Sequence, residues 1–329
     1  MNRIVIFLTF FCLSFSSLCS FAEDSFFPAP ILSLSDGITP HALVVEKATN
    51  TLSIYENQDN KPRLLKSFKI GTGKLSGDKK TQGDSKTPEG AYRFLEFYSK
   101  QELIKRYGKE APIYGIGAFT ISYPNIFDLL QKKTGGGIWL HSTNDNSRIN
   151  QGQTSRGCVV VTDEQLKEIS QYVSLRNTPI LIVQELNFLE TKTWEKNRNK
   201  LLQTVEGWRK AWEQENLDDY ISYYDHELFK SGSRGKIKTY KTYKAQVFSH
   251  PGKPSIQFTD VTGLAFDDYA LVQIKQHYKS SILGDTGKKV LYLKKDQNYE
   301  WKIVSEDFER WEAPESQVAG SVYFGNSKI

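Results

Sequence analysis

Cysteine is scarce in this 329-residue chain, which holds three cysteines and a single methionine. Two of the three, Cys12 and Cys19, lie in an N-terminal segment that is typical of an export signal. In it Arg3 precedes an apolar run, and the small residues Ser20 and Ala22 occupy the two positions that a signal peptidase reads. We therefore expect a signal peptide over residues 1–22 and a periplasmic mature protein with one thiol, Cys158. Oxidising compartments favour paired cysteines or none, so a lone cysteine indicates either a catalytic thiol or a small buried hydrophobe.

Long apolar runs and blocks of like charge are also missing. The N-terminal run is interrupted by Ser14, Ser16 and Ser17, too early for the roughly 20 residues of a membrane span. The net charge of +5 includes no basic arm, so we expect no nucleic-acid partner. A mildly basic surface leaves peripheral association with a cell wall or membrane open. The chain length favours two domains.

Short β-type segments separated by turn residues occupy the first half of the mature chain. After an N-terminal extension, 23–40, that reads as a loop, the predicted strands are 41–46, 51–55, 64–70, 92–97, 117–122, 137–141, 159–161 and 180–183. A short helix follows Thr162, which forms a predicted capping box with Gln165. The pattern predicts a mostly-β domain from 41 to 186.

The composition changes after residue 187. A helix over 191–215 carries apolar residues three and four apart: Leu201, Leu202, Val205, Trp208 and Trp212. A short helix at 218–225 and four long strands follow, which predicts an α+β cone domain over 187–315 and a tail over 316–329. The order resembles the nuclear transport factor 2-like fold. The tryptophans favour core packing over a pocket lining, and the ligand of this domain is not readable from the sequence.

The residues that suggest chemistry lie in 135–148 and 155–161. His141 ends one predicted strand and Cys158 begins the next, so adjacent strand ends can place an imidazole beside a thiol that needs a base. Gly157 allows a tight turn whose amides point at one place, as an oxyanion hole requires. Taken singly, His141 could be an ordinary loop histidine and the glycine an ordinary turn. Together with the single thiol they favour nucleophilic catalysis.

This segment resembles the catalytic motif of the L,D-transpeptidase (YkuD-type) family, in which a histidine is followed by a Ser-x-Gly-Cys turn. The similarity extends over about 41–186, through Leu43-Val-Val-Glu-Lys47, Leu52-Ser-Ile-Tyr55, Gly71-Thr-Gly73 and Thr87-Pro-Glu-Gly90. The resemblance implies that Cys158 is the nucleophile and His141 its general base. It also implies that the Ser142 carbonyl orients the imidazole and that the amides of Gly157 and Cys158 hold the oxyanion. We expect no metal or organic cofactor.

Two positions depart from the family pattern. Ser142 stands where glycine is common, and a serine tolerates positive φ less well. Arg156 stands where histidine is usual, which leaves His141 as the only candidate base. The arginine could lower the thiol pKa or pair with a substrate carboxylate, or it could simply face solvent. The predicted substrate-binding residues are Arg156, Ser155, Trp139 and Thr143.

Both motifs and the C-terminal cone together are similar to the L,D-carboxypeptidases that set helical cell shape. This narrower resemblance implies that tetrapeptide stems of peptidoglycan muropeptides are trimmed to tripeptides by cleavage between meso-diaminopimelate and D-alanine. The alternative is an L,D-transpeptidase that forms cross-links or attaches a protein to the wall. A third possibility is a non-catalytic wall-binding module. Four lysines crowd the loop 71–90, which is either a lid facing an anionic glycopeptide or an ordinary solvated loop: Lys74, Lys79, Lys80 and Lys86.

Overall fold

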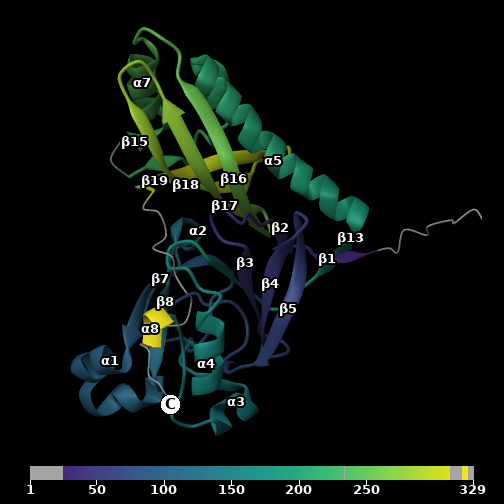
Figure 1. Cartoon of the computed structure of the whole chain (residues 1–329), viewed down its shortest axis with the longest axis vertical. Helices are drawn as coiled ribbons and strands as arrows, with labels where there is room; N and C mark the ends of the chain where they lie inside the picture. The colour runs from purple at the N-terminus through teal and green to yellow at the C-terminus, as the bar shows by residue number, and fades with distance from the viewer. Residues whose placement is uncertain (1–24, 233, 312–320, 325–329) are drawn as a thin grey trace, which may run out of the picture.

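A computed structural model describes residues 25–232, 234–311 and 321–324, which form two domains stacked along the long axis (Figure 1). The predicted signal peptide, 1–22, and most of the predicted tail lie outside the described residues. Within the described ranges, no helix has the length and apolar character needed to cross a membrane.

An eight-stranded sheet forms the first domain, in the order β11-β9-β8-β7-β12-β3-β4-β5. Its strands are β3 (His41–Glu46), β4 (Thr51–Gln58), β5 (Lys61–Lys69), β7 (Gly90–Ser99), β8 (Gly117–Ile121), β9 (Trp139–His141), β11 (Val159–Val160) and β12 (Pro179–Val183). The β3–β4 hairpin turns through Asn50, which has a φ of 51°. The predicted mostly-β domain is confirmed, because the alternation of apolar residues and the turn signals mark these strands.

Short helices between the strands were largely missed from the sequence. They are α1 (Lys100–Tyr107), η1 (Gly108–Tyr114), α2 (Ile126–Leu130) and α3 (Ser147–Gln151), accompanied by the short strands β6 (Thr72–Gly73) and β10 (Gln153–Ser155). Only α4 (Asp163–Ser170) was predicted, and its Thr162 accepts a hydrogen bond from the amide of Gln165 as expected. Ser99 and Glu102 form an equivalent capping box at α1, a signal that marks the missed helix.

The second domain packs helices against a curved antiparallel sheet. Its elements are β13 (Phe188–Glu190), α5 (Thr191–Gln214), α6 (Leu217–Ser222), β14 (Lys230–Ser231), β15 (Gly235–Lys236), α7 (Ile237–Phe248), β16 (Ser255–Phe266), β17 (Tyr269–Lys279), β18 (Gly284–Lys295) and β19 (Trp301–Arg310). Helix α5 runs diagonally along the sheet (Figure 1). It buries Leu201, Val205, Trp208 and Trp212, so the predicted packing role of the two tryptophans is confirmed.

The prolines of the N-terminal extension suggested a loop, but the extension also contains two short strands. Strand β1 (Phe26–Pro28) pairs with β13, and β2 (Ile31–Ser33) adds a fifth strand to the sheet of the second domain by pairing with β16. Proline lacks an amide donor, but Pro28 lies at the end of a short edge strand where no donor is needed. The indole Nε1 of Trp194 donates to the Ile31 carbonyl at 2.9 Å. The chain therefore passes through the second domain before it builds the first.

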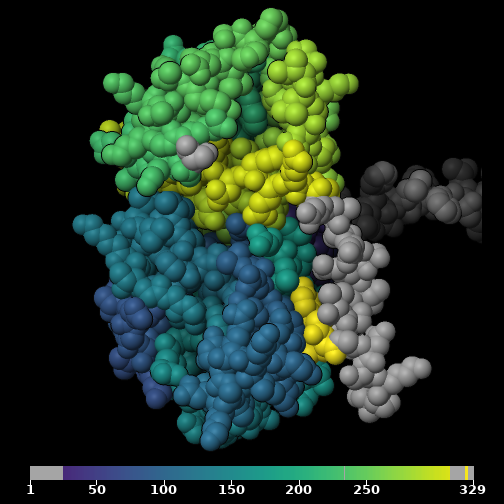
Figure 2. Space-filling model, turned by 90° about the vertical axis from the view of Figure 1, so that its left-hand side faces the viewer, coloured from purple at the N-terminus to yellow at the C-terminus, as the bar shows by residue number. Residues whose placement is uncertain are grey.

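The two domains share a buried interface. Apolar side chains from both pack together, among them Ile31, Val44, Leu181, Leu264 and Val290. Figure 2 shows the second domain seated directly on the first. At the edge of this core Glu309 pairs with Arg93 at 3.0 Å and with Lys288 at 2.9 Å. The last described helix, α8 (Ser321–Phe324), returns to the first domain, where the Tyr323 hydroxyl donates to the Val173 carbonyl. These contacts hold the domains in one relative orientation.

Candidate active site

Strands β9 and β11 bring the two predicted catalytic residues together. They pair in parallel with Val159 opposite Leu140 and Val160 opposite His141. Cys158 immediately precedes β11, so the register places it beside Trp139. Because side chains alternate between the two faces of a sheet, Cys158 and His141 lie on the same face, diagonally across from one another. The sequence prediction of adjacent strand ends thus describes the observed arrangement.

Cys158 is half-buried and lies just before β11. Its Sγ lies 3.6 Å from the carbonyl oxygen of Gly137 and accepts a hydrogen bond from the backbone of Trp139. Burial raises the pKa of the thiol above its ordinary value, against the lowering effects of the Trp139 amide and of nearby cations. The thiol is therefore protonated at neutral pH and needs a base during attack.

His141 is buried and oriented by its neighbour in the chain. Its Nδ1 lies 2.6 Å from the carbonyl oxygen of Ser142, and a carbonyl can only accept, so Nδ1 carries the proton. The other nitrogen, Nε2, is left with a lone pair. Burial lowers the pKa of the imidazole to about 4, opposed by the Ser142 carbonyl and aided by the charge of Arg148. A neutral histidine with a free Nε2 is the form that can take a proton from a thiol.

Ser142 occupies the glycine position of the family without backbone strain. It is absent from the described residues with positive φ, so the difficulty expected for a serine does not arise. Its hydroxyl accepts a hydrogen bond from the amide of Ile116 at 2.8 Å. The side chain thereby ties β9 to the start of β8, while the backbone carbonyl remains available to His141.

The turn before the nucleophile requires glycine. Gly157 has a φ of 128°, and an added Cβ would lie 2.7 Å from the carbonyl oxygen of Lys86. Its amide donates to the hydroxyl of Ser155 at 3.0 Å, and that hydroxyl donates to the Cys158 carbonyl at 2.6 Å. Across the described residues, the amide of Cys158 meets no acceptor. Of the two amides expected to hold an oxyanion, only that of Cys158 is free in this state.

The predicted substrate-binding residues fall into two groups. Ser155 and Thr143 are both buried. The Ser155 hydroxyl donates to the carbonyl of Cys158 in the turn, and the Thr143 hydroxyl accepts a hydrogen bond from the guanidinium of Arg148. Their contact with substrate stays a prediction. Trp139 is half-buried and Arg156 is exposed. The indole of Trp139 lies within 6 Å, centroid to centroid, of three tyrosine rings: Tyr98, Tyr107 and Tyr114.

Two residues near the thiol were not singled out from the sequence. Nη1 of Arg148 donates to the Ile113 carbonyl and to the Thr143 hydroxyl, and its charge lowers the pKa of both His141 and Cys158. Its place seven residues after His141, in the same motif, was the available signal. The ring of Tyr114 meets that of His141 edge-on with centroids 5.0 Å apart. No sequence pattern indicated it, because η1 brings it back to the site.

The loop 71–90 is held to the end of β3 and to itself by ion pairs whose lysines are buried. Lys47 donates to the carbonyls of Gly77 and Thr87 and pairs with Glu89 at 2.8 Å. Lys79, predicted as a candidate for a lid facing an anionic substrate, is buried and pairs with Asp84 at 2.7 Å. Its charge still reaches the thiol and lowers the pKa of Cys158.

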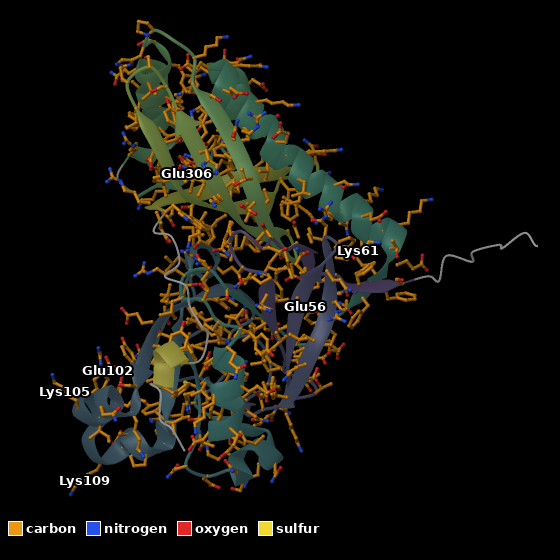
Figure 3. The ribbon with its side chains drawn as sticks, viewed as in Figure 1. Glu56, Lys61, Glu102, Lys105, Lys109 and Glu306 are labelled. Carbon is orange, nitrogen blue, oxygen red and sulfur yellow. The ribbon has the colours of Figure 1, made fainter. Side chains whose placement is uncertain are left out.

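A second polar cluster lies inside the cone of the second domain. The hydroxyls of Tyr220, Tyr224 and Tyr240 hydrogen-bond one another around Glu306, which also pairs with Lys289 at 3.3 Å. Figure 3 places Glu306 among the strands of this domain. As to metals, the described part of the chain contains no group of three or more His, Cys, Asp or Glu side chains arranged to hold an ion.

Both domains match known protein families. The L,D-transpeptidase catalytic domain profile matches residues 40–182, and that of the Cds6 C-terminal NTF2-like domain matches residues 200–307. The solved structure of Bd1075 from Bdellovibrio bacteriovorus is 30% identical, covers 88% of this chain and 100% of its own, and superposes with a TM-score of 0.75. The chain belongs to the L,D-transpeptidase (YkuD) family.

Two further proteins are similar to this chain. The helical cell shape determining protein Pgp2 of Campylobacter jejuni is 26% identical, covering 85% of this chain and 95% of Pgp2 with a TM-score of 0.64. YafK of Escherichia coli K12, named provisionally as an L,D-transpeptidase, is 30% identical over 138 residues. That match covers 41% of this chain and 48% of YafK, so the chain spans about half the length of this curated relative. The matched ranges lie near the predicted domains of 41–186 and 187–315, whose boundaries remain a proposal.

Proposed function

We propose that this YkuD-family enzyme is a periplasmic peptidoglycan L,D-carboxypeptidase that trims tetrapeptide stems to tripeptides. The observation that supports it most is the fixed imidazole. The Ser142 carbonyl holds the Nδ1 proton of His141, which leaves Nε2 as a base on the sheet face that also carries Cys158. The periplasmic location rests on the family and on the predicted signal peptide.

The reaction follows from these groups. Nε2 of His141 takes the proton of the Cys158 thiol as sulfur attacks the carbonyl carbon of the L-centre of meso-diaminopimelate. The amide of Cys158 donates to the developing oxyanion. The imidazolium then gives its proton to the amine of D-alanine, which leaves, and a thioester remains on Cys158. Water, deprotonated by His141, attacks the thioester and releases the tripeptide stem.

The charges around the thiol favour a substrate that ends in a carboxylate. The positive charges of Arg148, Arg156 and Lys79 all lower the pKa of the Cys158 thiol. Cleavage of the last residue of a stem places that residue's carboxylate next to the scissile bond, where it meets this positive potential. Arg156 is exposed beside the nucleophile and is the cation best placed to pair with it.

The alternative is an L,D-transpeptidase, which the family name favours and which shares the acyl-enzyme. The two differ only in whether water or an amine resolves the thioester. The test is to incubate the protein with disaccharide tetrapeptide and to identify the products by mass spectrometry, with Cys158→Ala as the matched control. Disaccharide tripeptide supports the carboxypeptidase, and dimeric muropeptides support the transpeptidase. Unchanged substrate contradicts both.

A further inference from the structure

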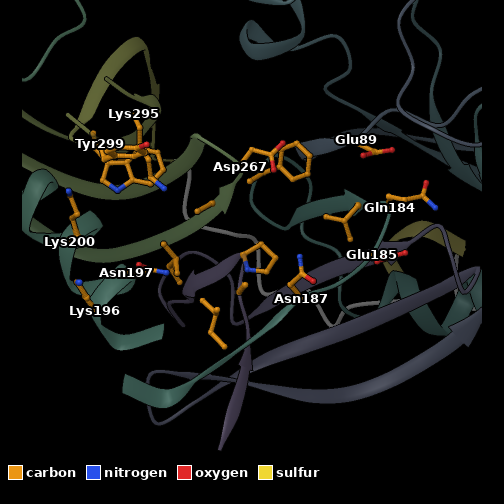
Figure 4. Close-up of a pocket in the computed structure, with 18 residues that line it drawn as sticks. Glu89, Gln184, Glu185, Asn187, Lys196, Asn197, Lys200, Asp267, Lys295 and Tyr299 are labelled. Atoms are coloured by element: carbon orange, nitrogen blue, oxygen red, sulfur yellow. The ribbon is translucent and has the colours of Figure 1, made fainter. Parts of the chain in front are cut away.

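A cavity of about 780 Å³ lies between the two domains, away from Cys158 (Figure 4). Its walls come from the β1–β2 segment, the connection 183–187, the start of α5, and the turns that end β16 and β18. Neither domain alone encloses it. Its volume falls in the range of small-ligand pockets, which occur preferentially at domain interfaces.

The charges that line this cavity are separated by sign. Three lysines lie on the side formed by α5 and the end of β18, and three carboxylates lie on the side nearer the first domain (Figure 4): Lys196, Lys200 and Lys295 opposite Glu89, Glu185 and Asp267. Lys200 pairs with Glu300 and Glu89 with Lys47. The other four charges meet no oppositely charged partner in the described ranges.

On the carboxylate side, the Gln184 amide and the Asp267 carboxylate each lack, in the described part of the chain, a partner that a ligand could supply. The carbonyl oxygen of the Gln184 side chain is buried without a donor among the described residues. Burial and the like charges of Asp268 and Glu89 raise the pKa of Asp267, so a cation beside this carboxylate is favoured. On the lysine side, Nζ of Lys295 lies over the ring of Trp301, 4.8 Å from its centroid, and remains open to an anion.

We propose that this interdomain cavity binds a zwitterionic peptide, with its carboxylates toward Lys196 and Lys295 and its ammonium group toward Glu185 and Asp267. A purely anionic ligand such as phosphate would face uncompensated repulsion from the two carboxylates. A peptidoglycan stem that ends in diaminopimelate has the required chemistry, with several carboxylates and one free amine. This choice of peptide rests on the proposed function.

The cavity is linked to the nucleophile turn through the segment 86–89. Glu89 lines the cavity and pairs with Lys47, whose Nζ also holds the Thr87 carbonyl at 3.0 Å. One residue earlier, the Lys86 carbonyl packs against Gly157, where an added Cβ would lie 2.7 Å from it. The wall of the cavity and the turn that carries Cys158 are therefore joined through one short segment of backbone.

The test is calorimetric titration of the full-length protein carrying Cys158→Ala. Two probes are compared: N-acetyl-L-alanyl-γ-D-glutamyl-meso-diaminopimelate, whose one free amine is that of diaminopimelate, and the same tripeptide with that amine acetylated as well. Lys196→Ala with Lys295→Ala weakens the binding of both probes at least tenfold. Glu185→Gln with Asp267→Asn weakens only the free-amine tripeptide by that factor. Lys210→Ala, on α5 outside the cavity, is the matched control and changes neither.

Binding that ignores all four charges, or no binding, overturns the proposal. The outcome is separable from that of the proposed function. If the tripeptide binds with the stated charge dependence but tetrapeptide is never trimmed, the cavity stands and the carboxypeptidase falls. If tetrapeptide is trimmed but binding does not respond to the four substitutions, the cavity proposal falls alone.

Discussion

The Nδ1 of His141 lies 2.6 Å from the carbonyl oxygen of Ser142, the residue that follows it in the chain. The acceptor in this contact is a backbone oxygen, so the contact can form whether the residue at position 142 is serine or glycine. It fixes both the ring orientation and the tautomer, which leaves Nε2 of His141 to face the thiol side of the sheet. Two predictions below separate what the ring does from what the serine side chain does.

Replacement of the base removes catalysis. His141→Gln lacks a proton acceptor of suitable pKa and is expected to lower kcat by about 10²–10⁴-fold, the usual contribution of a general base. The measurement is the rate of D-alanine release from disaccharide tetrapeptide, with circular dichroism to check folding. A variant that keeps more than about a tenth of the wild-type kcat would show that another group takes the proton.

Ser142→Gly separates the carbonyl from the hydroxyl. The carbonyl contact to His141 remains, so kcat/KM stays within about tenfold of wild type. The hydrogen bond from the Ile116 amide is lost, and the free energy of unfolding falls by about 1–2 kcal/mol. Urea denaturation measures the second quantity. A large loss of activity with unchanged stability would assign the serine hydroxyl a catalytic part.

Gly157→Ala tests the turn. Its φ of 128° and the 2.7 Å approach of the Lys86 carbonyl forbid a Cβ without movement of the backbone. A displacement of about 1 Å at the nucleophile can lower activity about 10²-fold, and the strained φ destabilises by about 1–3 kcal/mol. Steady-state kinetics and thermal denaturation report the two effects. Full activity would mean that the Cys158 amide does not depend on this turn.

Acid is expected to destabilise the protein through His141. Because burial lowers the folded-state pKa to about 4, the unfolded chain binds the proton first as the pH falls. The stability contribution of the neutral imidazole is complete above its ordinary pKa of about 6.5 and is lost as the pH falls toward 4. The unfolding free energy of wild type minus that of His141→Gln, measured from pH 7.5 to 4.5, isolates this slope. If the difference in unfolding free energy did not change with pH, the His141 imidazole would have the same pKa in the folded and unfolded chain and would not be buried.

At the domain interface, one carboxylate forms ion pairs with two buried cations. Glu309→Gln leaves Arg93 and Lys288 without their shared partner and is expected to lower the unfolding free energy by about 1.5–3 kcal/mol. The exposed pair of Lys200 and Glu300 is the control, because Glu300→Gln changes stability by no more than about 1 kcal/mol. Equal effects of the two substitutions on the unfolding free energy would show that the ion pairs of Glu309 do not stabilise the domain interface.

The sequence predicted the elements whose signal is local. Alternating apolar residues marked the strands of the first domain, the capping box of Thr162 and Gln165 marked α4, and the apolar spacing marked α5. The proximity of His141 and Cys158 was also predictable, since they lie at the end of one strand and just before the next in a short stretch of sequence. These features depend on residues that are close to one another in the sequence.

What the sequence did not predict depends on distant contacts. Strand β2 pairs with β16, more than 200 residues away, and no local pattern marks such a partner. Tyr114 reaches the site only because η1 turns back toward β9. The hydrogen bond that occupies the Gly157 amide depends on the rotamer of Ser155, which a motif does not specify. Long-range pairing and side-chain direction are the parts that required the structure.

The most direct test of the account is to trap the acyl-enzyme. The protein is mixed with disaccharide tetrapeptide, quenched in acid within the first turnovers, and examined by intact-protein and peptide mass spectrometry. The account predicts a thioester on Cys158, seen as a mass gain equal to the disaccharide tripeptide less one water, and no such gain on Cys158→Ala. Product formation with no adduct on Cys158, or with the alanine variant still active, would contradict it.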